Sequence, residues 1–245
     1  MKNKIFVSAM VFVLSLTIVC GCGGKAENDV KSDAKIIRGR MLAVENTEEK
    51  TVCLTFDDGP TPVTERVLDV LKEYGIKATF FVIGKNAERY KDILRRIFAE
   101  GHTVGIHTYS HEYKKIYASP AALADDIKRC LCVIKAVNSE YEPIFYRFPG
   151  GSFGLSEELL KVPDSMGLTS VDWNASCRDS EVRSADALSL CAFARETAGK
   201  KTKVIMLLHD AADKSTTADA LPRIVNDFKE REFSFISLEK VVKIS

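Results

Sequence analysis

The sequence has no surplus of positive charge, because its 35 Lys and Arg residues are balanced by 34 Asp and Glu residues. The net charge is +1, and no basic stripe runs along the chain. Proteins that bind nucleic acid need such a stripe or patch, so nucleic acid is not an expected partner. The sequence also lacks internal repeats and low-complexity segments, and 46% of its 245 residues are hydrophobic. These values are typical of one large α/β domain or two small ones.

The seven cysteines form no disulfide framework and no Cys-x-x-Cys pair of the kind that binds metal. Cys53 lies in an apolar run and is expected in the core. Cys130 and Cys132 are expected on different sides of a helix, because residues two positions apart do not share a helical face. Export would permit disulfides, but the sequence identifies no pair.

No apolar run is long enough for a well-flanked transmembrane helix. Lys2 and Lys4 precede an uncharged apolar run over residues 5–19, which is the pattern of a targeting signal. A Val-Cys-Gly-Cys segment that ends at Cys22 resembles a bacterial lipobox, in which Cys22 would carry the lipid. An ordinary secretory signal and an uncleaved anchor are the alternatives. All three place the folded part of the chain outside the cytoplasm.

We therefore expect a lipoprotein-type signal peptide (1–21), a flexible tether (22–48) and one folded domain (49–245). In that domain, apolar strands are predicted at 51–56, 77–84, 103–106, 144–146, 168–173, 204–208 and 233–238. Helices are predicted at 61–74, 90–100, 121–137, 155–166, 185–198 and 218–230, and Pro163 is expected to break the helix over 155–166. This alternation predicts a parallel sheet, and the chain is short for a complete eight-fold barrel of ~250 residues. The expected fold is α/β, an irregular, incomplete (β/α)7-type barrel.

The first predicted strand ends at two adjacent carboxylates, Asp57 and Asp58, before a Gly-Pro turn. Two carboxylates this close cost electrostatic energy unless a positive group neutralises them. One interpretation is a solvated turn. The other is a cation site, in which one Asp binds a metal and the other remains free as a base.

Polar or aromatic residues also follow four other predicted strands, namely His107, Arg147, Trp173 and His209. The carboxyl ends of parallel strands form one rim of a barrel, where active sites lie. Each residue alone also fits a structural or solvent-exposed role, but their shared position favours an active site. Arg147 is placed to pair with a carboxylate that is not on the metal, and His209 is a candidate general acid.

His107 and His111 are four residues apart, so on one helical turn they would share a face. With one Asp from the first strand they form a two-His, one-carboxylate set. Three protein ligands with an open position are typical of a catalytic zinc site, although another divalent metal would also fit. The Pro-Gly-Gly loop after Arg147 leaves backbone N–H groups near Gly150 free to face an oxyanion.

Five ordered motifs resemble those of the polysaccharide deacetylases, also called carbohydrate esterase family 4. They are Thr55-Phe56-Asp57-Asp58-Gly59-Pro60, His107-Thr108-x-x-His111, Arg147-x-Pro149-x-Gly151, Trp173 with Asp179, and Leu207-x-His209. The resemblance covers about residues 50 to 240. That family of metal-dependent esterases includes chitin, chitooligosaccharide and peptidoglycan deacetylases, and its fold is an incomplete (β/α) barrel.

The resemblance implies a role for each motif residue. Asp58, His107 and His111 would bind the metal, most often Zn²⁺, with Co²⁺, Ni²⁺ or Mn²⁺ as alternatives. Asp57 would be the general base held by Arg147, and His209 the general acid oriented by Asp179. Gly150 would supply an oxyanion donor, while Trp173 and Leu207 would line the pocket for the acetyl methyl group. Two departures stand out: the fourth motif is loosely kept, and Gly150 stands where many members have Tyr, so an aromatic wall is lost.

The expected protein is a membrane-anchored, monomeric enzyme whose catalytic domain removes N-acetyl groups from N-acetylglucosamine units. Its substrate would be a cell-wall glycan such as peptidoglycan, or a chitooligosaccharide. The alternatives are an esterase that removes O-acetyl groups from xylan or a similar polysaccharide, and a non-catalytic glycan-binding lipoprotein.

Overall fold

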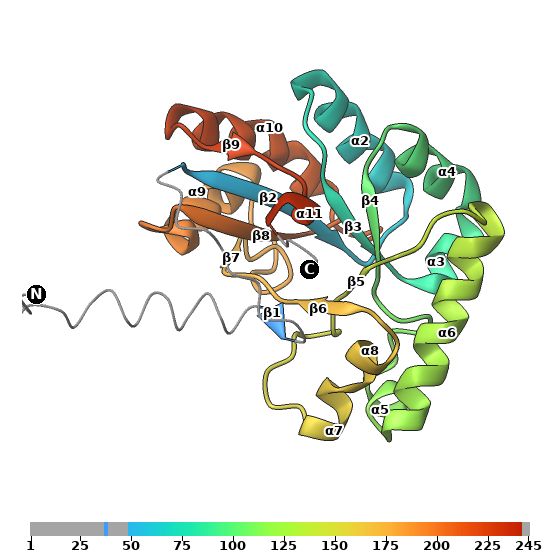
Figure 1. Ribbon diagram of the computed structural model, residues 1–245. Helices are drawn as coiled ribbons and strands as arrows, with labels where there is room; N and C mark the ends of the chain where they lie inside the picture. The colour runs from blue at the N-terminus through green and yellow to red at the C-terminus, as the bar shows by residue number, and fades with distance from the viewer. Residues whose placement is uncertain (1–36, 39–48, 242–245) are drawn as a thin grey trace, which may run out of the picture.

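The computed structural model, shown in Figure 1, describes residues 37–38 and 49–241. The predicted signal peptide, Cys22 and nearly all of the tether lie outside this part of the chain. A curved, mainly parallel sheet forms the centre, with the strand order β1-β6-β5-β4-β3-β2-β8-β7 and β9 beside β2. The strands are β1 (Ile37–Arg38), β2 (Thr51–Asp57), β3 (Thr79–Val82), β4 (Thr103–Ile106), β5 (Phe145–Tyr146), β6 (Thr169–Val171), β7 (Ala175–Ser176), β8 (Lys203–His209) and β9 (Ser234–Phe235). Only β1 runs antiparallel to its neighbour among these strands.

The long helices lie around the outside of the curved sheet (Figure 1). They are α2 (Pro62–Tyr74), α4 (Lys91–Ala99), α6 (Pro120–Val137), α9 (Ala187–Ala198) and α10 (Ser215–Glu230). Short helices are α3 (Gly84–Arg89), α5 (Tyr113–Ile116), α7 (Glu157–Leu160), α8 (Val162–Ser165) and α11 (Leu238–Val241). The main hydrophobic core lies between these helices and the sheet. None of the helices in the described ranges has the length and apolar character needed to cross a membrane.

A second, smaller core fills the inside of the curved sheet. It consists of Cys53, Phe81, Phe145, Val171, Ile205 and Leu238. Because side chains alternate along a strand, Cys53 and Thr55 share the face on which Asp57 also lies. Leu238 belongs to α11, whose Glu239 accepts a hydrogen bond from Thr103 at the start of β4. Apolar side chains therefore close the end of the barrel where the strands begin, and the polar rim lies at the other end.

The incomplete barrel predicted from the alternation of strands and helices is confirmed, as is the core position of Cys53. Cys130 is buried and Cys132 exposed, as predicted. The predicted break of the helix over 155–166 is confirmed: the segment forms two short helices, and Pro163 lies in the first turn of α8, where proline is tolerated. Three predicted strands are too long. The strand over 77–84 ends at Val82, the strand over 168–173 ends at Val171, and the strand over 233–238 ends at Phe235 before α11 begins.

Candidate active site

Asp57 and Asp58 end strand β2 but face different surroundings. Asp57 is 2% exposed and is paired in register with His209 of β8 and Phe81 of β3. Asp58 has a φ of +76°, in the left-handed region that non-glycine residues rarely adopt. Its carbonyl oxygen accepts a hydrogen bond of 2.7 Å from Asn86 Nδ2 of α3. The turn therefore directs two neighbouring carboxylates to different positions, Asp57 into the barrel and Asp58 toward the loop after β4.

The Asp58 carboxylate lies beside two histidines. Its Oδ1 is 3.3 Å from Nε2 of His111 and 3.5 Å from Nε2 of His107. One ligand atom from each of the three residues lies within 4.8 Å of the others. This Oδ1 is buried and has no hydrogen-bond partner in the described part of the chain. A buried, unpaired carboxylate oxygen is costly, so these residues fit a bound divalent cation.

The tautomer of His107 also fits a metal ligand. Its Nδ1 is 2.9 Å from the carbonyl oxygen of Arg147. A carbonyl oxygen can only accept, so Nδ1 carries the proton and Nε2 presents its lone pair toward Asp58. Burial lowers the pKa of His111. A lowered pKa keeps the His111 imidazole neutral, as a ligand must be.

The spacing of the two histidines suggested that they share a helical turn, but the structure shows that they do not. The segment between β4 and α5 is a loop in which Thr108 and His111 have φ values of +68° and +57°. Asp126 of α6 holds this loop, because its Oδ1 accepts hydrogen bonds from the backbone N–H groups of Tyr109 (2.5 Å) and Ser110 (2.9 Å). A helix behind the loop therefore fixes the approach of the imidazoles.

Arg147 is fully buried and bonded in several directions. Its Nη1 donates to Asp57 Oδ1 at 2.9 Å and to Thr55 Oγ1 at 2.7 Å. Its Nε donates to the Val171 carbonyl at 2.9 Å, and its Cζ lies 4.2 Å from the centre of the Phe81 ring. The solvent-exposed alternative for Arg147 is thus wrong, and the guanidinium holds Asp57 in place by charge and by geometry.

His209 forms a second pair on the same rim. Its Nδ1 is 2.7 Å from Asp179 Oδ1, and its backbone N–H donates to Asp179 Oδ2 at 2.8 Å. Thr217 Oγ1 also donates to that oxygen at 2.8 Å. Burial alone would lower the pKa of His209, but the hydrogen bond and charge of Asp179 outweigh it and raise the pKa to about 9. Asp179, the residue of the loosely kept motif, is therefore in direct contact with the imidazole.

The family model for polysaccharide deacetylases matches residues 44–171, which is more than half of the 245 residues. The chain belongs to the polysaccharide deacetylase family. It is 30% identical over 197 residues to a peptidoglycan-N-acetylglucosamine deacetylase of Bacillus cereus, covering 80% of this chain and 89% of that protein. It is 32% identical over 212 residues to a chitooligosaccharide deacetylase of Sinorhizobium fredii, covering 81% and 95% of the two chains.

Solved structures agree with this assignment. The crystal structure of the catalytic domain of a peptidoglycan N-acetylglucosamine deacetylase from Eubacterium rectale has a TM-score of 0.74 and 29% identity. That match covers 84% of this chain and 96% of the other. The polysaccharide deacetylases are hydrolases that act on amide bonds, and both relatives are named as deacetylases. The incomplete (β/α)7-type barrel is thus the fold of the family.

The remaining predicted residues of this polysaccharide deacetylase surround the rim. Gly150 is exposed with a φ of +75°, and its N–H has no hydrogen-bond partner among residues 49–241. Leu207 is buried on β8, in register with Thr55. Trp173 is half-buried, with its ring centre 5.7 Å from Cζ of Arg147. The structure brings these three residues to the rim, and their contacts with substrate remain predictions.

Two carboxylates near the site were not identified from the sequence. Asp210 is fully buried directly after His209, and its Oδ2 accepts a hydrogen bond of 2.5 Å from Thr64 Oγ1. Burial raises the pKa of Asp210 to about 7. Asp172, next to Trp173, accepts hydrogen bonds from both the N–H and the hydroxyl of Ser152. The burial of Asp210 and the contact between Asp172 and Ser152 are both visible only in three dimensions.

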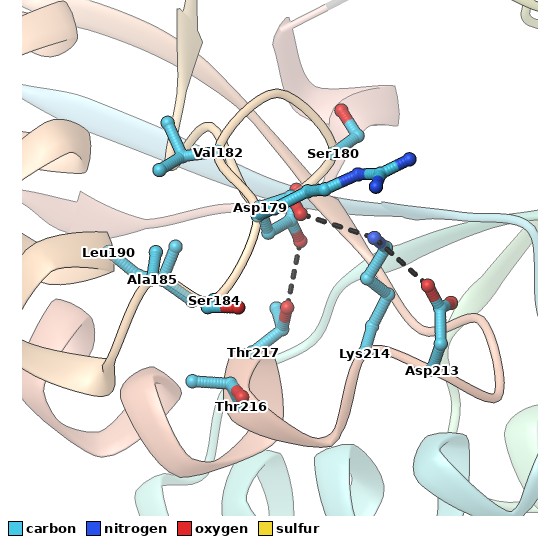
Figure 2. A pocket seen from close by; sticks show the side chains of 11 residues that line it. Asp179, Ser180, Val182, Ser184, Ala185, Leu190, Asp213, Lys214, Thr216 and Thr217 are labelled. Carbon is cyan, nitrogen blue, oxygen red and sulfur yellow. Dashed lines mark hydrogen bonds and ion pairs between the residues drawn. The ribbon is translucent and has the colours of Figure 1, made fainter.

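A pocket of about 310 Å³ lies beside Asp179 (Figure 2). Its walls come from the loop after β7 and from the start of α10, and none of the three candidate metal ligands lines it. In Figure 2, Lys214 Nζ donates to the Asp179 carbonyl at 3.2 Å and pairs with Asp213 at 3.2 Å. The pocket therefore borders the Asp179–His209 pair and is separate from the candidate metal site.

Proposed function

We propose that the protein is a metal-dependent deacetylase that removes N-acetyl groups from N-acetylglucosamine units of peptidoglycan or a chitooligosaccharide, releasing acetate and a free amine. The observation that carries this proposal is that Asp57, at the end of β2, and Asp58, directly after it, have different partners. Asp58 lies with the two histidines, while Asp57 is bonded to Arg147. The named relatives, which act on these glycans, support the choice of substrate.

Asp58, His107 and His111 would hold the divalent cation. Their two imidazole nitrogens and one carboxylate oxygen suit Zn²⁺, and Co²⁺, Ni²⁺ and Mn²⁺ are the alternatives. When bound, such an ion supplies Lewis-acid polarisation of the acetyl carbonyl and of a water molecule.

Asp57 is placed to act as the general base. Its Oδ1 accepts the hydrogen bond from Arg147 Nη1, so Oδ2 is the oxygen left to take a proton from the attacking water. The fixed guanidinium holds the carboxylate in one orientation before the reaction begins. Preorganisation of this kind removes the need for the base to move during proton transfer.

His209 is placed to act as the general acid. Its pKa of about 9 means that the imidazole is protonated at neutral pH. Nδ1 is bonded to Asp179, so Nε2 is the atom that would give its proton to the leaving amine. An amine is too basic to leave an amide without that proton, and proton transfer from a positioned side chain contributes roughly 10²–10⁴-fold in rate.

The remaining rim residues would hold the acetyl group. The free N–H of exposed Gly150 would donate to the oxyanion that forms from the carbonyl oxygen. Trp173 and Leu207 would contact the acetyl methyl group. These roles are proposed from the resemblance and from the position of each residue at the rim.

The test is acetate release from peptidoglycan, N-acetylglucosamine tetramer and acetylxylan, each before and after chelation and after addition of Zn²⁺. We expect release from an N-acetylated glycan, loss with chelator and recovery with metal. Release from acetylxylan alone would support the O-acetyl esterase instead. Binding of glycans without any release would support a non-catalytic glycan-binding protein.

We also propose that the protein is anchored to the outer side of the cell membrane through a lipid on Cys22. The proposal rests on the lipobox-like segment that ends at Cys22 and on a substrate that lies outside the cytoplasm. Membrane fractionation of the wild type and of Cys22→Ala tests it. The substitution should abolish lipid attachment and processing, and an unchanged membrane fraction with unchanged processing would contradict the proposal.

A further inference from the structure

Two consecutive glycines at the rim each lie against an aromatic ring. Gly150 and Gly151 have φ values of +75° and +84°. A Cβ atom on Gly150 would lie 3.0 Å from Cε1 of Tyr113, and one on Gly151 would lie 2.8 Å from Cδ2 of Phe153. A side chain at either position would therefore require a ring to move. The glycines leave room for two aromatic side chains that come from different segments of the chain.

Both rings are unusually exposed. Tyr113 is 47% and Phe153 is 64% exposed, and only two other large hydrophobic side chains in the described part of the chain, Val182 and Leu188, are exposed to a comparable degree. Exposure of an aromatic ring leaves apolar surface in water, and such rings beside a polar site are typical of ligand-binding surfaces.

Both rings are also connected to the proposed active site. The Tyr113 ring meets the His111 ring edge to face, with centres 5.3 Å apart. The Phe153 ring meets the Trp173 ring in the same manner, with centres 6.2 Å apart. One ring thus borders a candidate metal ligand, and the other lies beyond the residue proposed to contact the acetyl group.

The Tyr113 hydroxyl provides a polar group on this surface. It has no hydrogen-bond partner in the described residues, and it would lie 3.2 Å from a Cβ atom on Gly150. Tyr113 occupies the space over Gly150. Its ring thereby supplies an aromatic surface at the position where many family members have Tyr in place of Gly150.

We propose that Tyr113 and Phe153 form a glycan-contact surface on either side of Gly150 and Gly151. The apolar C–H face of a pyranose ring would pack on each aromatic ring, as flat apolar surfaces do on aromatic side chains. Tyr113 would contact the sugar that carries the reacting acetamide, because it borders His111, and Phe153 would contact a neighbouring sugar. This inference rests on the proposed function, which supplies the glycan.

The first test compares a long and a short substrate. We expect Phe153→Ala to lower kcat/KM on N-acetylglucosamine tetramer about tenfold, through KM, and to stay within twofold of wild type on 4-nitrophenyl acetate, which has no neighbouring sugar to pack on Phe153. Tyr113→Ala should lose about tenfold on the tetramer, whereas Tyr113→Phe, which keeps the ring, should lose less than threefold. The control is Leu188→Ala, which removes a 62% exposed side chain on α9. It should leave kcat/KM unchanged for both substrates.

The second test separates this inference from the proposed function. Binding of the tetramer is measured by calorimetry in the Asp57→Asn background with and without Phe153→Ala or Tyr113→Ala. Weaker binding of about tenfold in each double variant supports the surface, even if the wild type released no acetate. Equal binding in all three proteins, or kcat/KM within twofold of wild type for both alanine variants on the tetramer, would overturn it.

Discussion

Asp57 and His209 occupy the same register position on two neighbouring parallel strands, β2 and β8. Registered residues of adjacent strands point to the same face of a sheet, so both side chains lie on the inner face at the rim. Each has a partner of opposite charge: Arg147 pairs with Asp57, and Asp179 pairs with His209. The two pairings leave a carboxylate that can accept a proton beside an imidazolium that can give one.

Asp57→Asn should abolish deacetylation while the metal stays bound. Asn keeps the size of the side chain but cannot take a proton from water, and loss of a general base costs roughly 10²–10⁴-fold in rate. Acetate release and metal content by elemental analysis check this. Asp58→Asn is the matched variant, in which metal content should fall. Metal loss in Asp57→Asn but not in Asp58→Asn would mean that the two carboxylates have the opposite roles.

Asp179→Asn should shift the alkaline limb of the pH profile to lower pH. Asp179 raises the pKa of His209 above its ordinary value, to about 9, so the acid form is present in the wild type up to about that pH. Without the negative charge the imidazole loses its proton at a lower pH, while activity near pH 6 changes less. The measurement is kcat/KM from pH 6 to 10. An unmoved alkaline limb would remove His209 from the role of general acid.

Arg147→Met should destabilise the fold by about 3–5 kcal/mol, because it leaves Asp57 as an unpaired charge in a buried position. Denaturant unfolding of wild type and variant gives this difference. The matched control is Arg66→Met, since Arg66 pairs with Asp219 on the surface, where both side chains are about half exposed. Such a pair contributes about 0–1 kcal/mol. Similar losses for both variants would argue against a special role for the buried pair.

Gly59→Ala should weaken metal binding and destabilise the fold by about 1–3 kcal/mol, the usual cost of overpacking. A Cβ atom on Gly59 would lie 2.2 Å from Oδ2 of buried Asp210, so the turn that follows Asp58 must shift. Gly154→Ala is the control for metal affinity, because its φ of +77° strains an alanine but nothing lies within 4 Å of a Cβ there. Isothermal titration with Zn²⁺ should show a lower affinity only for Gly59→Ala; equal affinities would show that the turn tolerates the shift.

The order of strands and helices could be predicted from apolar periodicity, and so could the strand ends that carry Asp57, His107, Arg147 and His209. These features depend on residues close together in the sequence. The helix α3 was missed because its six residues, 84–89, show no apolar period, and the strand β7 was missed because two residues carry no pattern. Pairing with β8 defines that strand, and a distant partner is not visible locally.

The geometry of the site was predictable only in part. The His107–His111 spacing indicated two ligands, but the helical turn was wrong, because contacts from Asp126 stabilise a loop with two positive φ values instead. Asp210 was missed because nothing in an apolar strand end shows that the next Asp will be buried. The position of Tyr113 over Gly150 depends on the start of α5 and on a loop 37 residues further along the sequence, and only the folded chain brings them together.

The direction of β1 has a consequence for how the domain faces its surroundings. β1 runs antiparallel to β6, with Ile37 beside Val171, the last residue of β6. The parallel strands end at the rim, so the chain runs through β1 from the rim toward the closed end. An anchor placed before Ile37 would therefore lead into the domain from the side that carries Asp57 and Asp58.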